Sequence, residues 1–143
     1  KEFYKMDETK ILTLKHVELI FAETNADSKY GASITIDATD PELRDTIIKY
    51  HKANNLPEPK FKEYVNERTN ETTMQYNVKL AKFVDIKGKE NYGPSELGRG
   101  AVVNVVINAY DYDNNFNKGT SKSATAIFII EPKKNNAMDL IAE

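Results

Sequence analysis

The strongest pattern in the chain lies in residues 100–131, which run GAVVNVVINAYDYDNNFNKGTSKSATAIFIIE. Every second side chain of the first arm is apolar: Ala101, Val103, Val105, Ile107 and Ala109. The return arm alternates too, with Ala124, Ala126, Phe128 and Ile130 on one face and Ile127 and Ile129 on the other. Strict alternation predicts β-strands, and the polar turn at 113–119 predicts that they form one long hairpin.

The other parity of the first arm predicts a surface for a ligand. It carries Asn104, Asn108, Tyr110 and Tyr112, and Phe116 lies in a turn too short to bury it. Aromatic rings offer stacking surface and amides offer hydrogen bonds, which suits a planar polar ligand. The plain alternative is a face that only contacts water.

Residues 10–23 also alternate, but the apolar parity changes midway. Leu14 belongs to one apolar set, whereas Phe21 belongs to the other, so we expect a bulge near Lys15 and His16. The stretch is also longer than a flat strand in a small domain needs, so it should bend. Bent strands of this kind are a device of β-barrels.

Two more alternating runs, residues 30–36 and 73–86, complete the predicted sheet. In the second run Lys79 and Phe83 fall on the outward parity, which repeats the mixed face of the hairpin. Lys82 interrupts the inward apolar set, and this indicates a bulge or the edge of a barrel.

The pattern of residues 40–54 predicts the one strong α-helix, because Asp40 or Thr39 can accept hydrogen bonds from free backbone amides and Pro41 suits the first turn. Its apolar stripe consists of Leu43, Ile47, Ile48 and Tyr50. Residues 60–64 interleave lysines with aromatic residues, and this pattern fits a strand or a loop equally well.

The composition limits the function classes. The chain has 143 residues, no cysteine and a net charge of -2. We expect one domain at 1–131 with a tail at 132–143, without disulfides or thiolate metal sites. No apolar run approaches the roughly 20 residues of a membrane helix, and residues 1–5 do not resemble a signal peptide, so a soluble protein of the cytoplasm is expected. With this net charge, binding to a polyanion needs a local cluster of cations.

No sequence motif predicts catalysis. Residues 111–115 begin like a calcium loop, but Phe116 and Lys122 stand where glycine and glutamate are needed. The two histidines stand alone, and no phosphate-binding glycine loop or nucleophile motif occurs. We therefore predict no enzyme, cofactor or metal, although the carboxylates of Asp111 and Asp113 leave an acid–base pair open.

Several stretches together resemble phage single-stranded DNA-binding proteins with an oligonucleotide/oligosaccharide-binding (OB) barrel. They are residues 14–21, residues 30–36, and above all residues 98–131, with a glycine-led strand, a turn through Phe116 and an apolar run ending at Glu131. The resemblance implies a mainly β fold with one or two helices, built on a five-stranded Greek-key barrel. It also implies binding of single-stranded DNA, without sequence preference, in phage replication and recombination inside the host cell.

Two features depart from that family. The usual barrel has its helix after the third strand, whereas the helix predicted here follows the second, so either the bent first strand serves twice or the topology is a variant. Relatives often carry a dense acidic tail that recruits replication proteins, but residues 132–143 hold only Asp139 and Glu143. Recruitment of replication or recombination proteins by this tail stays open, as does a homodimer.

The predicted DNA-contacting residues are cations for the phosphates and aromatic rings for the bases. They are Lys15, Lys79, Phe83, Lys87, Lys89, Tyr92, Arg99, Tyr110, Tyr112, Phe116, Lys118 and Lys122. Several lie in the glycine-bearing connection 87–99, a predicted clamp. The cations are expected to line one groove, with the acids of 40–45 and 63–71 elsewhere. If the cations scatter among acids, a protein–protein interaction module, such as a phage inhibitor or assembly factor, is the competing function.

Overall fold

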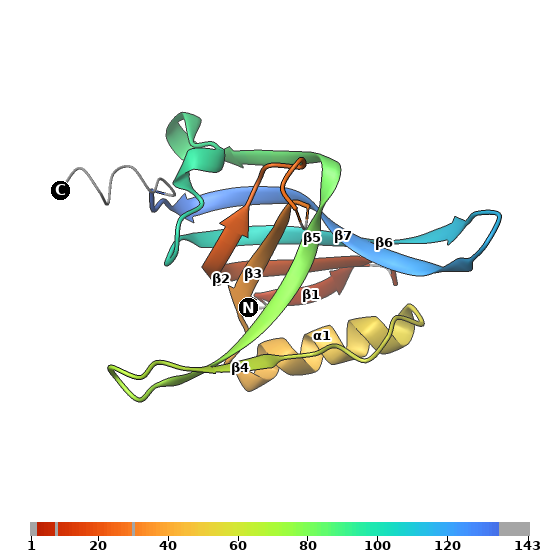
Figure 1. The fold of residues 1–143 in the computed structure, drawn as a ribbon, viewed down its shortest axis with the longest axis horizontal. Helices are drawn as coiled ribbons and strands as arrows, with labels where there is room; N and C mark the ends of the chain where they lie inside the picture. The colour runs from red at the N-terminus through yellow and green to blue at the C-terminus, as the bar shows by residue number, and fades with distance from the viewer. Residues whose placement is uncertain (1–2, 8, 30, 135–143) are drawn as a thin grey trace.

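The computed structural model describes residues 3–7, 9–29 and 31–134, and it is mainly β with one α-helix, as predicted (Figure 1). The strands are β1 (Tyr4–Asp7), β2 (Ile11–Glu23), β3 (Ser33–Asp37), β4 (Lys62–Val65), β5 (Thr72–Gly88), β6 (Val102–Asp113) and β7 (Lys118–Glu131). The helix α1 spans Pro41–Ala53, and two 3-10 helices, η1 (Lys89–Asn91) and η2 (Pro94–Glu96), lie between β5 and β6. The segment that fits a strand or a loop by sequence forms β4.

Hydrogen bonds run round five strands in the order β2, β3, β5, β7, β6 and back to β2. β5 and β7 are parallel, and the other pairs in this five-strand ring are antiparallel. Two strands lie outside the ring: β1 pairs with β2, and β4 pairs with β5. The expected OB-like set of five main strands is therefore confirmed as a barrel-like ring.

β2 closes the ring because it belongs to two ladders. Its first part pairs with β6 and its last part with β3. The predicted bulge is present between Leu14 and Val17, where His16 has a φ of 59° and its backbone N–H donates to Asn104 Oδ1 at 2.9 Å. The first strand of the ring does serve twice, and α1 lies between the second ring strand, β3, and the third, β5.

A second irregularity of β2 corrects the prediction for Phe21. Simple alternation places Phe21 inward, but the register shifts between Leu19 and Phe21, and Phe21 pairs with Thr35. Its side chain is 55% exposed on the outer face of the sheet. An extra residue in a strand leaves no mark in the alternation of a sequence until the partner strand is known.

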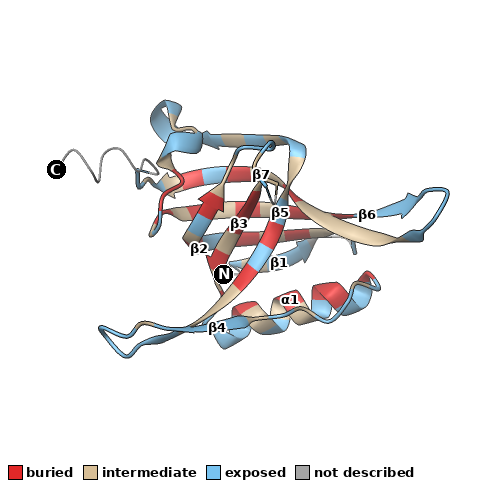
Figure 2. Cartoon of the chain, in the orientation of Figure 1, coloured by how far each residue is buried: buried red, intermediate tan, exposed pale blue. Residues whose placement is uncertain are grey.

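The core fills the five-strand ring, and the predicted inward parity of β6 is buried throughout (Figure 2). On β7 the ladder skips Thr125, so Ala124, Ile127 and Ile129 all turn inward while Phe128 remains 40% exposed. The prediction that Ala124 and Phe128 share one face is therefore wrong, again because of a bulge.

The helix begins as predicted, with Asp40 Oδ1 accepting from the backbone N–H of Glu42 at 3.0 Å. Leu43, Ile47 and Tyr50 are buried against the ring. Ile48, which was predicted to belong to the buried stripe, is only partly buried. His51 is buried there instead. Within the described residues, no helix is long and apolar enough to span a membrane.

The end of β7 is tied to the loop before β6. Lys133 forms a parallel bridge with Leu97, and the Gly98 N–H donates to Lys133 O at 2.8 Å. The rest of the predicted tail, residues 135–143 with its two acids, lies outside the described residues.

Candidate nucleic-acid interface

One group of predicted site residues lies on the part of the β6–β7 hairpin that extends past the five-strand ring (Figure 1). We call residues 110–122 the β6–β7 arm. It exposes the rings of Tyr110, Tyr112 and Phe116, with exposed fractions of 47%, 39% and 92%. Tyr112 lies across its own hairpin, since a Cβ at Gly119 would be 2.7 Å from the Tyr112 hydroxyl.

The cations at the arm are already engaged. Lys118 Nζ lies 3.9 Å from Asp113 Oδ2, and Lys10 Nζ lies 3.2 Å from Asp111 Oδ2. A hydrogen bond from Thr120 and the ammonium of Lys10 lower the pKa of Asp111. Lys122 turns to the core side, with its Nζ 5.6 Å from the centre of the Tyr76 ring, and burial lowers its pKa. The arm thus offers rings but little free positive charge.

A second group lies at the end of β5 and in the connection to β6. Phe83 is 86% exposed. Lys87 Nζ lies 3.3 Å from Asp85 Oδ2, Lys89 is exposed in η1, and Tyr92 packs partly against the core. Lys87 pairs with Phe128 in the β5–β7 ladder, ten residues along β7 from Lys118. That separation is roughly 33 Å in an extended strand, so the two groups do not share one compact groove.

The remaining predicted cations are separate from both groups. Lys15 is exposed at the bulge of β2, and Lys79 pairs with Ser33 in the β3–β5 ladder. Arg99 lines recesses beside β4, together with the acids Glu67 and Glu71. The prediction that the acids of residues 63–71 lie away from the cations is therefore wrong for this place.

A third region gathers aromatic side chains and cations, and the predicted set contains none of the residues that line it. A recess of about 590 Å³ opens on the outer face of β3, β4 and β5. Its lining consists of Thr35, Lys60, Phe61, Lys62, Gln75 and Asn77. We call it the Phe61 recess. No carboxylate lines it, and in the described part of the chain neither lysine ammonium has an ion pair or a hydrogen bond.

The Phe61 ring packs on Tyr76, which belongs to a series of hydrogen bonds. The Phe61 ring lies 5.8 Å from the ring of Tyr76, between centroids, and Tyr76 Oη lies 2.7 Å from His51 Nε2. His51 Nδ1 lies 2.7 Å from Pro57 O. A carbonyl only accepts, so Nδ1 carries the hydrogen and Nε2 accepts from the tyrosine hydroxyl. Burial lowers the pKa of His51, which keeps this neutral form.

The wall of the recess offers fixed hydrogen-bonding groups. Asn77 Nδ2 shares its two hydrogens among Ser33 Oγ, Ile34 O and Thr35 Oγ1, at 3.0–3.2 Å, so its Oδ1 remains available as an acceptor. Phe21 adds an exposed ring beside Thr35 on the same face. The signal that could have found this region is the interleaving of lysines and aromatics at residues 60–64, which becomes interpretable only when β4 is known to pair with β5.

The described residues offer no site for a metal ion beside these recesses. Within residues 3–7, 9–29 and 31–134, no group of three or more histidine, aspartate or glutamate side chains could hold a metal ion. The region is a basic and aromatic face on a barrel-like ring, and this combination is typical of proteins that bind single-stranded nucleic acid.

Comparison with known proteins identifies the fold. No protein-family profile matches the chain, and no curated protein shows significant sequence similarity to it. Among solved structures, the C-terminally truncated single-stranded DNA-binding protein of bacteriophage Enc34 matches with a TM-score of 0.63 at 13% identity, over 94% of this chain and 93% of that one. The same phage protein in complex with single-stranded DNA matches with a TM-score of 0.59 at 14% identity, over 94% and 93%. This chain thus has the fold of a phage single-stranded DNA-binding protein over nearly its whole length.

Proposed function

We propose that this protein binds single-stranded DNA on the outer face of β3, β4 and β5, with one base against Phe61 and the adjoining phosphates at Lys60 and Lys62. The observation that carries the proposal is the Phe61 recess, whose lining holds an aromatic ring and two lysines but no carboxylate, and whose lysines have no ion pair within the described chain. Stacking on a ring tolerates any base, and ammonium groups follow the backbone, so binding without sequence preference is expected. The fold shared with a phage protein that was solved with single-stranded DNA supports the same function.

The predicted residues of the arm and of the 87–99 connection remain part of the proposal as secondary contacts. Tyr110, Tyr112 and Phe116 supply exposed rings, and Phe83 supplies another near the end of β5. The ion pairs of Lys87 and Lys118 make these cations weaker phosphate ligands, because a carboxylate must be displaced first. The proposed role of the protein is in phage replication and recombination within the host cell.

A titration of fluorescently labelled oligonucleotide at several salt concentrations tests the proposal. With about three to five phosphates contacted, the slope of log affinity against log salt should be about -2 to -3.5, at roughly -0.7 per phosphate of a single strand. Poly-dT and mixed sequences should bind within about tenfold of each other, and duplex should bind far more weakly because its bases are already stacked.

Equal affinity for duplex and single strand, or no binding to either at low salt, would overturn the proposal. The competing function is then a protein–protein interaction module. One observation favours it: the arm exposes Phe116 at 92% and neutralises its own cations, as an apolar contact surface would.

A further inference from the structure

The β4–β5 hairpin and the loop before β6 form a second recess, of about 690 Å³. Its lining consists of Tyr64, Val65, Asn66, Glu67, Arg68 and Arg99. We call it the arginine recess. We propose that it is a second nucleotide subsite, which holds a phosphodiester of the bound strand between Arg68 and Arg99 and stacks the neighbouring base on Tyr64. The inference rests on the proposed function and adds the path of the strand beyond the Phe61 recess.

The two guanidinium groups are free to bind an anion. In the described part of the chain, neither Arg68 nor Arg99 has an ion pair or a side-chain hydrogen bond, although Glu67 lines the same recess. A guanidinium presents planar donors that match two oxygens of a phosphate. Two unpaired guanidiniums in one recess, beside a tyrosine that is 45% exposed, therefore suit a phosphate and its base.

The backbone on either side of Arg99 is fixed. The Gly98 N–H donates to Lys133 O and the Gly100 N–H donates to Leu19 O, both at 2.8 Å. Gly98 is also packed so closely that a Cβ there would clash with the backbone of Lys134. Arg99 is therefore presented by a segment anchored to β2 and to the end of β7, which reduces the entropy lost when it binds a phosphate.

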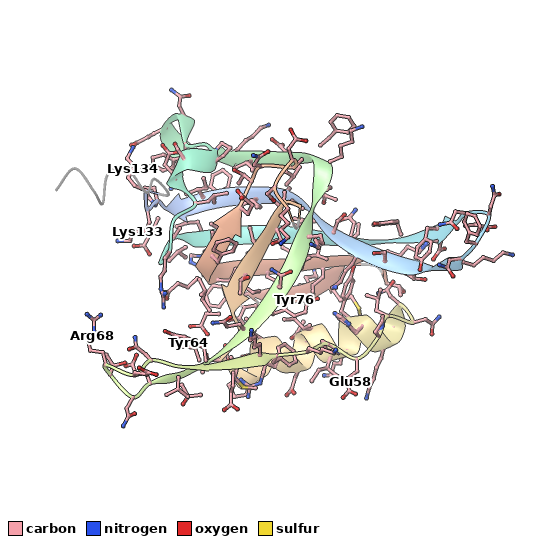
Figure 3. The ribbon with its side chains drawn as sticks, viewed as in Figure 1. Glu58, Tyr64, Arg68, Tyr76, Lys133 and Lys134 are labelled. Carbon is pink, nitrogen blue, oxygen red and sulfur yellow. The ribbon has the colours of Figure 1, made fainter. Side chains whose placement is uncertain are left out.

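Arg68 is anchored through a turn. Asn66 Oδ1 accepts from the backbone N–H groups of Arg68 and Thr69, at 3.0 and 3.3 Å. The Asn66 N–H donates to Glu71 O at 2.8 Å, which closes the hairpin. Figure 3 shows Tyr64 and Arg68 at the end of the molecule where Lys133 also lies, and a Cβ at Gly100, next to Arg99, would be 3.8 Å from the Lys133 side chain. This end thus gathers positive charge from three separate segments.

The two recesses follow each other along β4. Lys62 pairs with Gln75 and Tyr64 pairs with Thr73, so the two side chains of β4 are two residues apart and lie on the same side of the ladder. Their spacing is about 6.6 Å at roughly 3.3 Å per residue. A strand leaving the Phe61 recess along β4 therefore meets Tyr64 next.

Carboxylates limit the path on one side. A smaller recess of about 270 Å³, which Tyr64 and Arg99 also line, contains Glu18, Asp37 and Glu71. Asp37 Oδ1 already accepts from the Thr39 N–H, but the carboxylates of Glu18 and Glu71 have no ion pair within the described chain. A phosphate is repelled there, so the backbone passes on the Arg68 side.

The test uses oligo-dT of stepwise increasing length and four variants. Wild-type affinity should rise at the length that reaches the arginine recess, and Arg68→Ala/Arg99→Ala should lose that rise. The double variant should bind the longer oligonucleotides about tenfold more weakly, with a salt slope shallower by about 0.7 for the lost phosphate, and bind the shortest as wild type does. Lys49→Ala/Lys52→Ala, which removes two exposed cations from α1, is the matched control for net charge. Glu18→Gln should strengthen binding of the longer oligonucleotides.

The outcomes separate the two proposals. If the wild type binds no oligonucleotide at any length, the proposed function fails. If the wild type binds but the arginine variant matches wild type or the Lys49/Lys52 control, or weakens short and long oligonucleotides equally, the second subsite is overturned while the function stands. Arg99→Lys distinguishes geometry from charge: it should retain only part of the rise, because an ammonium lacks the planar fork of donors.

Discussion

The surface along β4 and the β6–β7 arm both expose aromatic rings, but they use their cations in opposite ways. At the arm, Lys10 and Lys118 are paired with Asp111 and Asp113. Along β4, the four cations Lys60, Lys62, Arg68 and Arg99 have no ion pair within the described chain. The number of lysines and arginines in a segment therefore says little about anion binding until their carboxylate neighbours are known.

The two surfaces also differ in what supports their rings. Phe61 packs on Tyr76, which is hydrogen-bonded to a buried histidine of α1, whereas the Phe116 side chain is 92% exposed. A ring that is already held in place loses less side-chain entropy when a base stacks on it. We therefore expect the β4 surface to dominate DNA affinity and the arm to add to it.

The largest effect should come from removing the supported ring. Phe61→Ala should weaken binding of oligo-dT by roughly 1–3 kcal/mol, because one base loses its stacking partner. Phe61→Tyr, which retains a ring, should bind nearly as wild type does. Fluorescence anisotropy measures the affinity, and the thermal midpoint of each variant shows that the fold is intact. An unchanged affinity of a folded Phe61→Ala protein would shift the site to the arm.

The unpaired lysines should come next. Lys60→Gln/Lys62→Gln should weaken binding about tenfold at low salt and make the salt slope shallower by about 1.4, for two phosphates at roughly 0.7 each. Lys10→Gln/Lys118→Gln removes the same charge from the paired cations of the arm and should change affinity by less than about twofold, because a neighbouring carboxylate already balances each of these charges. Titrations at three salt concentrations compare the two variants, and equal losses of affinity would contradict a difference between the paired and the unpaired cations.

The rings of the arm should have a smaller effect. Tyr110→Ala/Tyr112→Ala should cost at most about 1 kcal/mol of DNA affinity, the lower end of the range for a stacked base. Because both side chains lie outside the core, the free energy of unfolding in urea should hardly change, whereas Ile107→Ala on the buried part of the same strand should cost about 2–5 kcal/mol. A loss of affinity larger than that of Phe61→Ala would reverse the ranking of the two surfaces.

The smallest effect concerns pH. Burial lowers the folded-state pKa of His51, so the unfolded chain takes up its proton first as the pH falls. The stability from neutral His51 is full above the unfolded pKa of about 6.5 and declines from there toward the lowered folded pKa. Urea unfolding from pH 7.5 to pH 5 should show this decline in the wild type and a shallower one in His51→Gln. His16→Gln, at the exposed histidine, is the control. An identical dependence of the free energy of unfolding on pH in all three proteins would contradict its assignment to His51.

The sequence alone determined the elements that depend on local periodicity and capping. The buried face of β6 follows from alternation over residues 101–109, and α1 follows from Asp40, Pro41 and the apolar stripe behind them. The bulge near His16 was predictable because the apolar parity itself changes there. These features are encoded within a few neighbouring residues, which a one-dimensional pattern can record.

Only the tertiary structure decided which side chains meet. Phe21 turns outward because of its register against β3, and the Phe61 recess exists because β4 pairs with β5 over a face completed by β3. The pairing of the arm's cations and the freedom of those along β4 likewise depend on residues far apart in the chain, such as Lys10 with Asp111. Electrostatic and packing interactions act through a few ångströms of space. The separation of two residues along the sequence does not determine their distance in space.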